Sequence, residues 1–414
     1  MKIHFNRKLL IRIIFFLYFV YFVMSYMGGE WTFSNSKHGM MPIYTYTVNN
    51  LRLVYLLLIL ILGLYELLLQ FKQKNISQID MLLFTIFFFV SFIHLYTVSQ
   101  LTDTQTLLFQ SGTPMMYLVF LAYFIGMDDK VKELLQKTAK VYGLVFLAFT
   151  MVYFLIFCMD IGYSFGVKFS SGPILYSFNN GFSLIVYALY QEKDFKRRLY
   201  WKITLPLCLI TSFITNSRSW VLQTIVLFMM CYIIQRRATH IIRNILKTVG
   251  VVFLILIVIN LVSPDLVGSL IARLGESTRL SQLETFFVQI PLSNLISGLG
   301  YNASYRFLMW SNYQYIDNQV IFSCFRYGIL VTALFLYFLI KPIVVAIQCG
   351  RETFFRAIGI LHFVFAILGL SVYFSLSIDM WCIISYMLAG RTYANIIQEN
   401  DRNRVNNCRY GKSR

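Results

Sequence analysis

Residues 53–70 read LVYLLLILILGLYELLLQ, an apolar stretch in which Glu66 is the one charged residue. A helix of about 20 apolar residues is long enough to cross the hydrocarbon core of a bilayer. A helix that is apolar on every face needs lipid or other protein around it along its whole length. The stretch therefore predicts a membrane-spanning helix, and we expect Glu66, near its end, to extend toward the polar surface.

Comparable stretches recur along the chain. They predict an all-α polytopic integral membrane protein with about 12 transmembrane helices, in which residues 1–414 form a single bundle. A count of about 11 stays open, because Asn216-Ser217-Arg218 alone separates two of the stretches. The expected spans are residues 9–26, 53–70, 80–97, 105–126, 141–159, 172–190, 201–215, 219–234, 248–263, 320–340, 357–372 and 374–389.

The composition fits this class of protein. Of the 414 residues, 58% are hydrophobic and 13% are charged, and the mean hydropathy is +0.66. A soluble chain of this length needs more polar surface, whereas lipid solvates an apolar exterior. The seven cysteines are scattered and form no C-x-x-C pair, so we expect neither a disulfide framework nor a metal site. We expect the first apolar stretch to be a retained signal anchor, because no small-residue cleavage site follows it.

The net charge of +18 is unevenly distributed along the chain. With the N-terminus in the cytoplasm, 27 Lys and Arg residues fall in segments inside the cell and 8 in segments outside. The positive-inside rule therefore predicts both termini in the cytoplasm, with residues 390–414 as a basic cytoplasmic tail. Anionic lipid headgroups account for the excess charge, so no nucleic-acid partner is expected. Asp128-Asp129, flanked by lysines, is expected in a solvated cytoplasmic loop.

One large extracytoplasmic loop is expected at residues 264–319, and we expect the chemistry there, because loops on a rigid scaffold carry function. The pattern predicts two amphipathic helices at the membrane interface. The first starts at Pro264 and is broken by Gly275, and the second is capped by Ser277 and stopped by Pro291. The turn that follows reads Ser297-Gly298-Leu299-Gly300-Tyr301.

Arginines outside the membrane oppose the charge bias and call for a reason. A guanidinium donates two parallel hydrogen bonds to a phosphate and stays charged. Arg218, Arg273, Arg279 and Arg306 are therefore candidates for a pocket that binds a polyanion such as a lipid diphosphate. The alternative for each is contact with headgroups or pairing with an acidic neighbour in the loop. For Arg218, which lies in a short turn between two spans, we favour function.

Other polar residues fall in the outer halves of the spans: His94, Asn179, Asn180 and Asp379. Such side chains face the interior of a bundle, and for His94 and the asparagines interhelical hydrogen bonding is the more common role. The outside carboxylates are dispersed without metal-ligand spacing, and no Walker loop or dinucleotide fingerprint is present. Chemistry on this side is therefore expected to be metal-independent, with arginine supplying the positive charge.

Two short patches resemble a known family when they are placed on this topology. The first is Thr215-Asn216-Ser217-Arg218-Ser219, a turn of small residues and an arginine between adjacent helices. The second is Gly298-Leu299-Gly300-Tyr301, then Asp317-Asn318 entering a helix, then Gly328. Over nearly its whole length the layout resembles the bacterial O-antigen and capsule polymerases of Wzy type, in the O-antigen ligase and polymerase superfamily. Asp317 stands where the ligases commonly have histidine, which favours a polymerase.

The resemblance implies a GT-C-like fold and a metal-independent membrane glycosyltransferase in the bacterial cytoplasmic membrane. The implied donor is a polyprenyl-diphosphate-linked oligosaccharide, carried on undecaprenyl diphosphate. Repeat units are joined into O-antigen, capsule or exopolysaccharide chains without a cofactor or nucleotide sugar. Membrane lipid is a partner, and whether a flippase and a chain-length regulator also act beside this chain stays open.

The family reaction assigns roles to the candidate residues. Arg218 is the expected catalytic and diphosphate-binding residue, assisted by Arg273, Arg279 and Arg306, because preorganised guanidiniums stabilise the charge on a departing diphosphate. Asp317 is the expected catalytic base or orienting acceptor for the attacking hydroxyl, with a helix N-cap as its alternative role. Sugar contacts are expected from Asn318, Tyr301 and Asn180. Stacking on sugar, or a place in an interfacial aromatic belt, is expected of Tyr301, Trp310, Tyr313 and Tyr315.

Two other functions remain as rivals. A flippase or transporter of the same lipid-linked oligosaccharide commonly shows an internal repeat and broken helices in matching positions. We find no convincing repeat between the two halves of the chain, and the long loop at residues 264–319 fits an enzyme better. An O-antigen ligase, which transfers finished polymer to another acceptor, is the second rival.

Overall fold

The computed structural model describes most of the chain. The described residues are 6–27, 42–97, 120–161, 172–190, 199–215, 220–227, 250, 257, 278–300, 303–316, 318–348 and 380–410.

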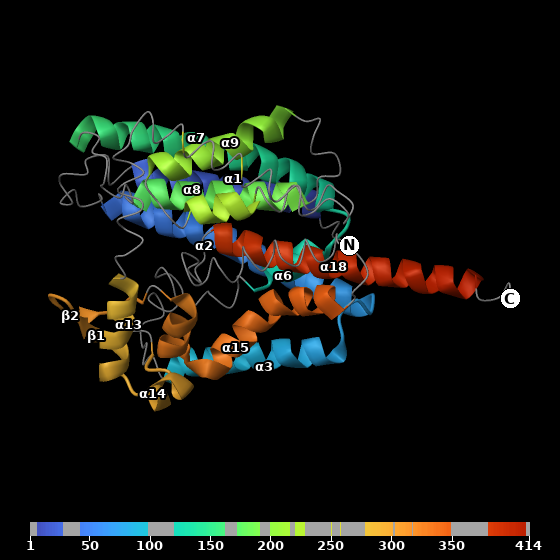
Figure 1. Cartoon of the computed structure of the whole chain (residues 1–414). Helices are drawn as coiled ribbons and strands as arrows, with labels where there is room; N and C mark the ends of the chain where they lie inside the picture. Colours follow the sequence, from blue (N-terminus) through green and yellow to red (C-terminus); the bar gives the residue numbers. More distant parts are fainter. Residues whose placement is uncertain are drawn as a thin grey trace.

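Helices make up nearly all of the described structure, which confirms the all-α class (Figure 1). A single two-stranded antiparallel sheet is the exception within the described residues. The helices of the bundle are α1 (Arg7–Met27), α2 (Pro42–Lys72), α3 (Gln78–Thr97), α6 (Ala122–Met127), α7 (Lys132–Ile161), α8 (Gly172–Tyr190), α9 (Leu199–Ile214), α15 (Gln319–Gln348) and α18 (Met380–Tyr410). Residues 220–227, after α9 in the chain, are also helical. The two strands form a hairpin within residues 305–313.

Three of these helices are long and apolar enough to cross a membrane. The qualifying segments are Asn50–Lys72 in α2, Lys132–Ile156 in α7 and Gln319–Val345 in α15. Two shorter apolar helices, Gln78–Val90 and Leu199–Ile214, accompany them. The exposed faces of the long helices carry large apolar side chains, which suit contact with lipid tails. The described chain therefore has the character of a membrane protein, and the number of spans stays a prediction.

The long helices run lengthwise through the bundle, which gives it two distinct ends (Figure 1). The beginning of α1 contacts the last third of α2 through Arg7 and Glu66, 3.1 Å apart. Likewise, Lys341 near the end of α15 contacts Asp80 at the start of α3. We call this the ion-pair end. The opposite end, where α2 and α15 begin their apolar segments, is called the hairpin end.

Close backbone contact holds α6 against α18 in the core. A Cβ atom built on Gly126 of α6 would overlap the carbonyl oxygen of Met387, and one built on Gly390 of α18 would overlap that of Tyr123. Small residues allow two helix backbones to approach in this way in membrane bundles. The aromatic side chains of Phe120 and Phe338 pack edge to face beside this contact, with ring centroids 4.0 Å apart.

The helix bounds agree with most of the expected spans that the structure describes, and several helices are longer than expected. The helix α8 covers residues 172–190 as expected, and α2 and α7 extend beyond the spans 53–70 and 141–159. Residues 390–414, expected as a tail, continue α18 as helix through Tyr410. The stretches 248–263 and 357–372 lie almost wholly outside the described residues, and α6 is the one helix of the expected span 105–126 that the structure describes.

At the hairpin end, a small folded unit precedes α15 (Figure 1). It consists of α13 (Thr278–Gln289), α14 (Leu292–Ser297), β1 (Tyr305–Phe307) and β2 (Trp310–Tyr313). Helix α13 matches the second amphipathic helix expected in the loop, whereas the first falls outside the described residues. Together with the beginning of α15, the unit forms a second apolar core of Phe286, Ile290, Ala303, Tyr305, Ile316, Phe322 and Phe325.

Candidate functional site

The sequence-predicted site residues divide into those the structure describes and those it does not. Arg306, Asn318 and Asn180 are described, and Arg279 is described as a backbone position in α13. The remaining candidates, Arg218, Arg273, Tyr301 and Asp317, lie outside the described residues. The site is therefore built from the framework around these four positions.

The glycines of the second sequence patch meet at one junction. Gly298, Gly300 and Gly328 all have positive φ angles, of 77°, 87° and 82°. Gly328 interrupts α15 with φ 82° and ψ 165°, a conformation almost exclusive to glycine. The N–H groups of Leu299 and Gly300 donate to the carbonyls of Phe325 and Arg326, at 2.8 and 3.0 Å. The break in α15 thus frees two carbonyls, and the loop supplies their partners.

Only glycine fits sterically on either side of this junction, at Gly298 after α14 and at Gly328 within α15. A Cβ atom on Gly298 would lie 2.5 Å from the Gly328 nitrogen, and one on Gly328 would lie 2.6 Å from the Ile296 carbonyl oxygen. Helix α14 therefore packs directly against the broken turn of α15. The junction fixes where the loop leaves α14 and where α15 begins, and these are the two flanks of the segment that holds Tyr301 and Asp317.

Asn318 caps the beginning of α15. Its Oδ1 accepts hydrogen bonds from the N–H groups of Val320 and Ile321, at 3.1 and 3.2 Å. This is the bonding pattern of an N-cap residue, which satisfies otherwise unpaired donors in the first turn. The capping role considered for Asp317 therefore belongs to Asn318, and the carboxyl group of the preceding residue is not required for it.

The hairpin presents side chains on the outside of the unit. Tyr305 pairs with Tyr313 and Phe307 with Trp310 across the strands. Trp310 is 67% exposed and Arg306 is exposed as well, whereas Tyr313 packs edge to face on Tyr305 with centroids 5.7 Å apart. Of the described aromatic residues predicted to meet a sugar, Trp310 is thus the most exposed, and Tyr313 packs within the hairpin.

The backbone of Arg306 is held firmly even though its side chain is exposed. Gln289 of α13 accepts a hydrogen bond from the Arg306 N–H at 2.9 Å and donates one to the Arg306 carbonyl at 2.7 Å. A side-chain amide that pairs with both backbone groups of one residue mimics a strand neighbour. The guanidinium of Arg306 therefore extends from a fixed base, which suits a binding role.

Asn180 takes the interhelical role that was the alternative to sugar binding. Its Nδ2 donates to the hydroxyl of Tyr18 in α1 at 2.9 Å, and its Oδ1 accepts from the N–H of Trp381 in α18 at 3.2 Å. The side chain is fully buried. Asn180 thus ties α8 to two other helices, and its amide is already engaged inside the bundle.

Arg218 lies outside the described residues, but the helices before and after residues 216–219 are described. Trp220, after the turn, stacks on Phe178 of α8 with centroids 4.0 Å apart. Ser212 of α9 and Thr224 share a hydrogen bond of 3.1 Å between their hydroxyls. The helical residues 220–227 therefore contact both α8 and α9, and the turn predicted at residues 216–219 stays a prediction.

Arg52 in α2 is a further candidate that was not among the site residues predicted from the sequence. Its side chain is 6% exposed, and Nη2 is buried without a hydrogen-bond partner. Among the described residues, Arg52 makes no ion pair. A buried charge without a partner costs several kcal/mol, so the arrangement is unusual. The sequence signal was its position, just inside the apolar segment of α2.

The ion-pair end differs in kind from the hairpin end. Arg7 contacts both Glu66, at 3.1 Å, and Asp128, at 2.6 Å. Burial opposes the charge of this guanidinium, but the two carboxylates outweigh it and raise the pKa of Arg7. Arg391 of α18 is fully buried and contacts Asp129 at 2.6 Å. Two expectations were therefore wrong: Glu66 does not extend to the surface, and Asp128 is buried rather than solvated.

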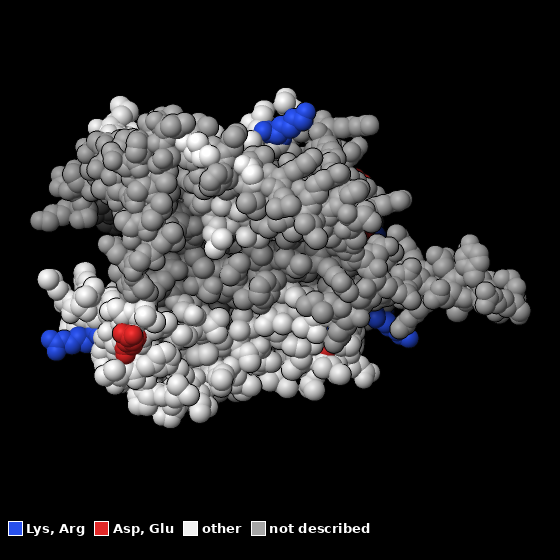
Figure 2. Space-filling view, viewed as in Figure 1, with Lys and Arg blue, Asp and Glu red and all other residues white. Residues whose placement is uncertain are grey.

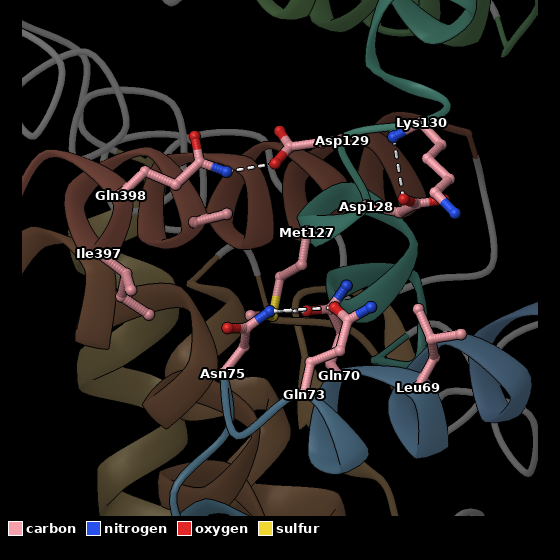
Figure 3. A pocket seen from close by; sticks show the side chains of 11 residues that line it. Leu69, Gln70, Gln73, Asn75, Met127, Asp128, Asp129, Lys130, Ile397 and Gln398 are labelled. Carbon is pink, nitrogen blue, oxygen red and sulfur yellow. Dashed lines mark hydrogen bonds between the residues drawn. The ribbon is translucent and has the colours of Figure 1, made fainter. Parts of the chain in front are cut away.

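A cavity of about 250 Å³ lies at this end, between α2, the turn after α6, and α18. Figure 3 shows amide and carboxylate side chains around it, with Asn75 donating to Gln70 at 2.7 Å and Gln398 donating to Asp129. The polar groups of the wall are thus bonded largely to one another. The cavity lies at the opposite end of the bundle from the hairpin, and the candidate site does not include it.

Charged side chains on the described surface gather toward the two ends. On the face shown in Figure 2, the described atoms in the middle of the view belong to uncharged residues. This distribution is the one expected where lipid tails surround the middle of the bundle. Within the described ranges, no three His, Cys, Asp or Glu side chains lie close enough together to hold a metal ion.

Comparison with known protein families, with curated proteins and with solved structures found no match to this chain.

Proposed function

We propose that this protein is a polysaccharide polymerase that joins polyprenyl-diphosphate-linked oligosaccharide repeats at the outer face of the bacterial cytoplasmic membrane. The observation that supports the proposal best is the meeting of Gly298, Gly300 and Gly328 at one helix break. These glycines belong to the patch on which the resemblance to the polymerases rests. The contact between these glycines explains why the patch needs glycine at three positions. It also fixes the two flanks of the segment that carries Tyr301 and Asp317.

The proposed reaction transfers a glycan between lipid carriers. A hydroxyl oxygen of the acceptor repeat attacks the anomeric carbon of the growing chain, and the bond from that carbon to the diphosphate oxygen breaks. Asp317 accepts the hydroxyl proton, and the polyprenyl diphosphate leaves with the bonding electrons. Arg218, Arg273, Arg279 and Arg306 stabilise the developing charge on the diphosphate, so the positive charge comes from arginine rather than from a metal.

The ends of the bundle are assigned from charge. The ion-pair end is proposed to face the cytoplasm, because the segments rich in Lys and Arg lie there by the positive-inside rule. The hairpin end then faces outward, where lipid-linked repeats are presented after translocation. Asn318, Tyr301 and the exposed Trp310 are the proposed contacts for sugar on that side.

One observation favours a second candidate, a flippase or transporter of the same lipid-linked oligosaccharide. Helix α15 is broken at Gly328, and broken helices line the substrate paths of many carriers. In the carrier folds such a break recurs at a matching position in the other half of the chain. The described helices of the first half contain no comparable non-helical interruption, so we rank transport second.

The two candidates differ in where substrate accumulates when the protein is lost. In cells that lack the chain, the polymerase proposal expects single lipid-linked repeats on the outer face of the membrane. Re-expression of the wild type should restore polymer, whereas Asp317→Asn should not, because the amide cannot accept the proton. Single repeats trapped on the cytoplasmic face would instead support transport and contradict the proposed function.

A further inference from the structure

We propose that Arg52 binds a phosphate group carried by a membrane lipid at the hairpin end of the bundle. Three properties of the residue lead to this inference: its depth in the membrane segment, its burial, and the lack of a counter-ion in the described structure. The inference rests on the proposed function where the lipid is a polyprenyl diphosphate. It stands independently where the lipid is an anionic phospholipid.

The depth of Arg52 follows from helix geometry. The apolar segment of α2 begins at Asn50 and reaches the ion-pair end at Glu66, which contacts Arg7. Arg52 and Glu66 are therefore separated by about 21 Å along the helix axis, at 1.5 Å per residue. The apolar segment continues to Lys72, about 30 Å from Arg52, and this length matches a hydrocarbon core of about 30 Å. Arg52 therefore lies near the boundary opposite the ion-pair end, where the phosphates of lipid headgroups begin.

The side chain does not reach water from that position. Arg52 is 6% exposed, in contrast to Arg12 of α1, which is exposed on the outside of the bundle. One turn further into the bundle, Tyr55 is completely buried and packs edge to face on Tyr18 with centroids 5.4 Å apart. Arg52 is thus withdrawn from solvent one helical turn before this pair of buried rings, which we call the aromatic floor of α1 and α2.

The charge of Arg52 calls for a counter-ion. A lysine or carboxyl group buried alone can lose its charge, but a guanidinium stays protonated in proteins. Two arginines at the ion-pair end contact carboxylates: the partly buried Arg7 contacts Asp128, and the fully buried Arg391 contacts Asp129. The described residues offer Arg52 no such carboxylate, and its Nη2 has no hydrogen-bond partner. An anion from outside the protein would give Arg52 the counter-ion that Arg7 and Arg391 find in carboxylates.

Phosphate is the anion that fits this position best. Lipid phosphates are concentrated at the boundary where Arg52 lies, and the planar guanidinium donates paired hydrogen bonds to phosphate oxygens. The aromatic floor and the apolar face of α2 suit the beginning of a prenyl or acyl chain. Arg52 would therefore orient a lipid whose phosphate lies at the hairpin end and whose tail lies along the bundle.

Binding can be measured without activity, on purified full-length protein in a phosphate-free nonionic detergent. Farnesyl diphosphate, farnesol and a short-chain phosphatidylglycerol are added separately, and thermal unfolding and dissociation constants are recorded. We expect farnesyl diphosphate to raise the Tm of the wild type while farnesol does not. Arg52→Gln should weaken this binding about 10-fold or more, the loss expected for a charge-assisted hydrogen bond.

Two further variants make the test specific. Arg52→Lys retains a point charge, so we expect binding intermediate between the wild type and Arg52→Gln. Arg12→Gln removes an exposed arginine from the same bundle and should bind farnesyl diphosphate as the wild type does. Without added lipid, Arg52→Gln should melt at or above the wild-type temperature, because it removes a buried charge that lacks a partner.

The outcomes separate the two sources of phosphate. Arg52-dependent binding of farnesyl diphosphate supports the polyprenyl carrier, and Arg52-dependent binding of phosphatidylglycerol alone supports a phospholipid, whatever the fate of the proposed polymerase activity. If Arg52→Gln binds both probes as tightly as the wild type, the inference is overturned. A marked loss of Tm in lipid-free Arg52→Gln would also overturn it, since that result assigns Arg52 a partner within the protein.

Discussion

At the residue scale, the charged groups at the ion-pair end contact one another in a way that the sequence pattern did not predict. Glu66 and Asp128 are far apart in the chain, yet both contact Arg7. Removal of one partner from a buried ion pair leaves the other charge uncompensated, which is more costly than the pair itself is favourable. The Arg7 ion pairs therefore hold the beginning of α1 against α2 and against the turn after α6.

Replacement of Arg7 with methionine should test these ion pairs. We expect Arg7→Met to lower the free energy of unfolding by about 3–5 kcal/mol, because two carboxylates at the ion-pair end would lose their counter-ion. Thermal unfolding followed by size-exclusion chromatography would measure the effect. Lys8→Met, which removes an exposed neighbouring charge, is the matched control and should change stability little. Equal stability of the two variants would show that Arg7 carries no structural role.

The neighbours Asp317 and Asn318 should separate into a catalytic residue and a capping residue. Asn318→Ala should lower stability by about 1 kcal/mol through loss of the N-cap, and Asn318→Asp should recover most of it. Asp317→Asn should leave the unfolding temperature unchanged and abolish polymer formation in the same preparation. The division would be wrong if Asp317→Asn destabilised α15 as much as Asn318→Ala does.

At the element scale, the most informative feature is the break in α15. An α-helix with a glycine at φ 82° loses two of its own hydrogen bonds, and here the loop after α14 replaces them. Both glycines adopt a backbone conformation that costs other residues about 1–3 kcal/mol. Any other residue at position 298 or 328 would therefore add backbone strain to the folded state.

Alanine at Gly298 should open the junction. We expect Gly298→Ala to lower the unfolding temperature and to reduce activity, because the added Cβ would lie 2.5 Å from the Gly328 nitrogen. Gly250→Ala provides the matched control: this glycine is helical and open around its Cβ position, so alanine should be neutral or slightly stabilising. Circular dichroism and thermal unfolding of the two variants would measure the difference. Indistinguishable behaviour would contradict a structural role for the junction.

The elements themselves show what the sequence can and cannot predict. The lengths of the apolar stretches predicted the bounds of α1, α8 and α9 to within a few residues. The prediction works because a helix that crosses lipid needs an apolar stretch as long as the hydrocarbon core is thick. The end of α18 was missed, since Arg391 reads as the start of a tail but is buried against Asp129. The hairpin was missed as well, because its short strands are stabilised by packing on Phe286 of α13, which no local pattern reveals.

The candidate site was predictable to a smaller extent than the helices. The glycine patch was recognised from the sequence, but its convergence with Gly328 depends on a tertiary contact. Asn180 was correctly placed on the inside of α8, whereas its partners Tyr18 and Trp381 come from helices at opposite ends of the chain. Arg52 carried no local signal beyond its depth, because burial and the lack of a counter-ion are properties of the folded bundle.

At the scale of the whole molecule, the two ends have different character. One end is closed by ion pairs, and the other holds a folded unit with exposed apolar side chains, among them Met309 at the hairpin tip, which is 100% exposed. An asymmetric protein of this kind in a membrane needs one fixed orientation to act. The proposed chemistry requires the hairpin end to face outward.

Cysteine labelling of intact cells would test this orientation. In a variant without the seven native cysteines, Met309→Cys should react with a membrane-impermeant maleimide added outside. Lys72→Cys, exposed at the ion-pair end, should react after the membrane is made permeable. The opposite pattern would place the hairpin in the cytoplasm and remove the basis for chemistry on the outer face.

The most direct test of the proposed function is polymerisation by the purified protein. Wild-type protein in lipid nanodiscs would be given an undecaprenyl-diphosphate-linked repeat unit from its own host, without metal or nucleotide sugar, and the glycans separated on a gel. We predict a ladder of lengthening products that Arg218→Ala abolishes. Lys202→Ala, which changes an exposed residue in the first turn of α9, should retain the ladder. A folded wild-type protein that leaves authentic repeat units unjoined would contradict the assignment as a polymerase.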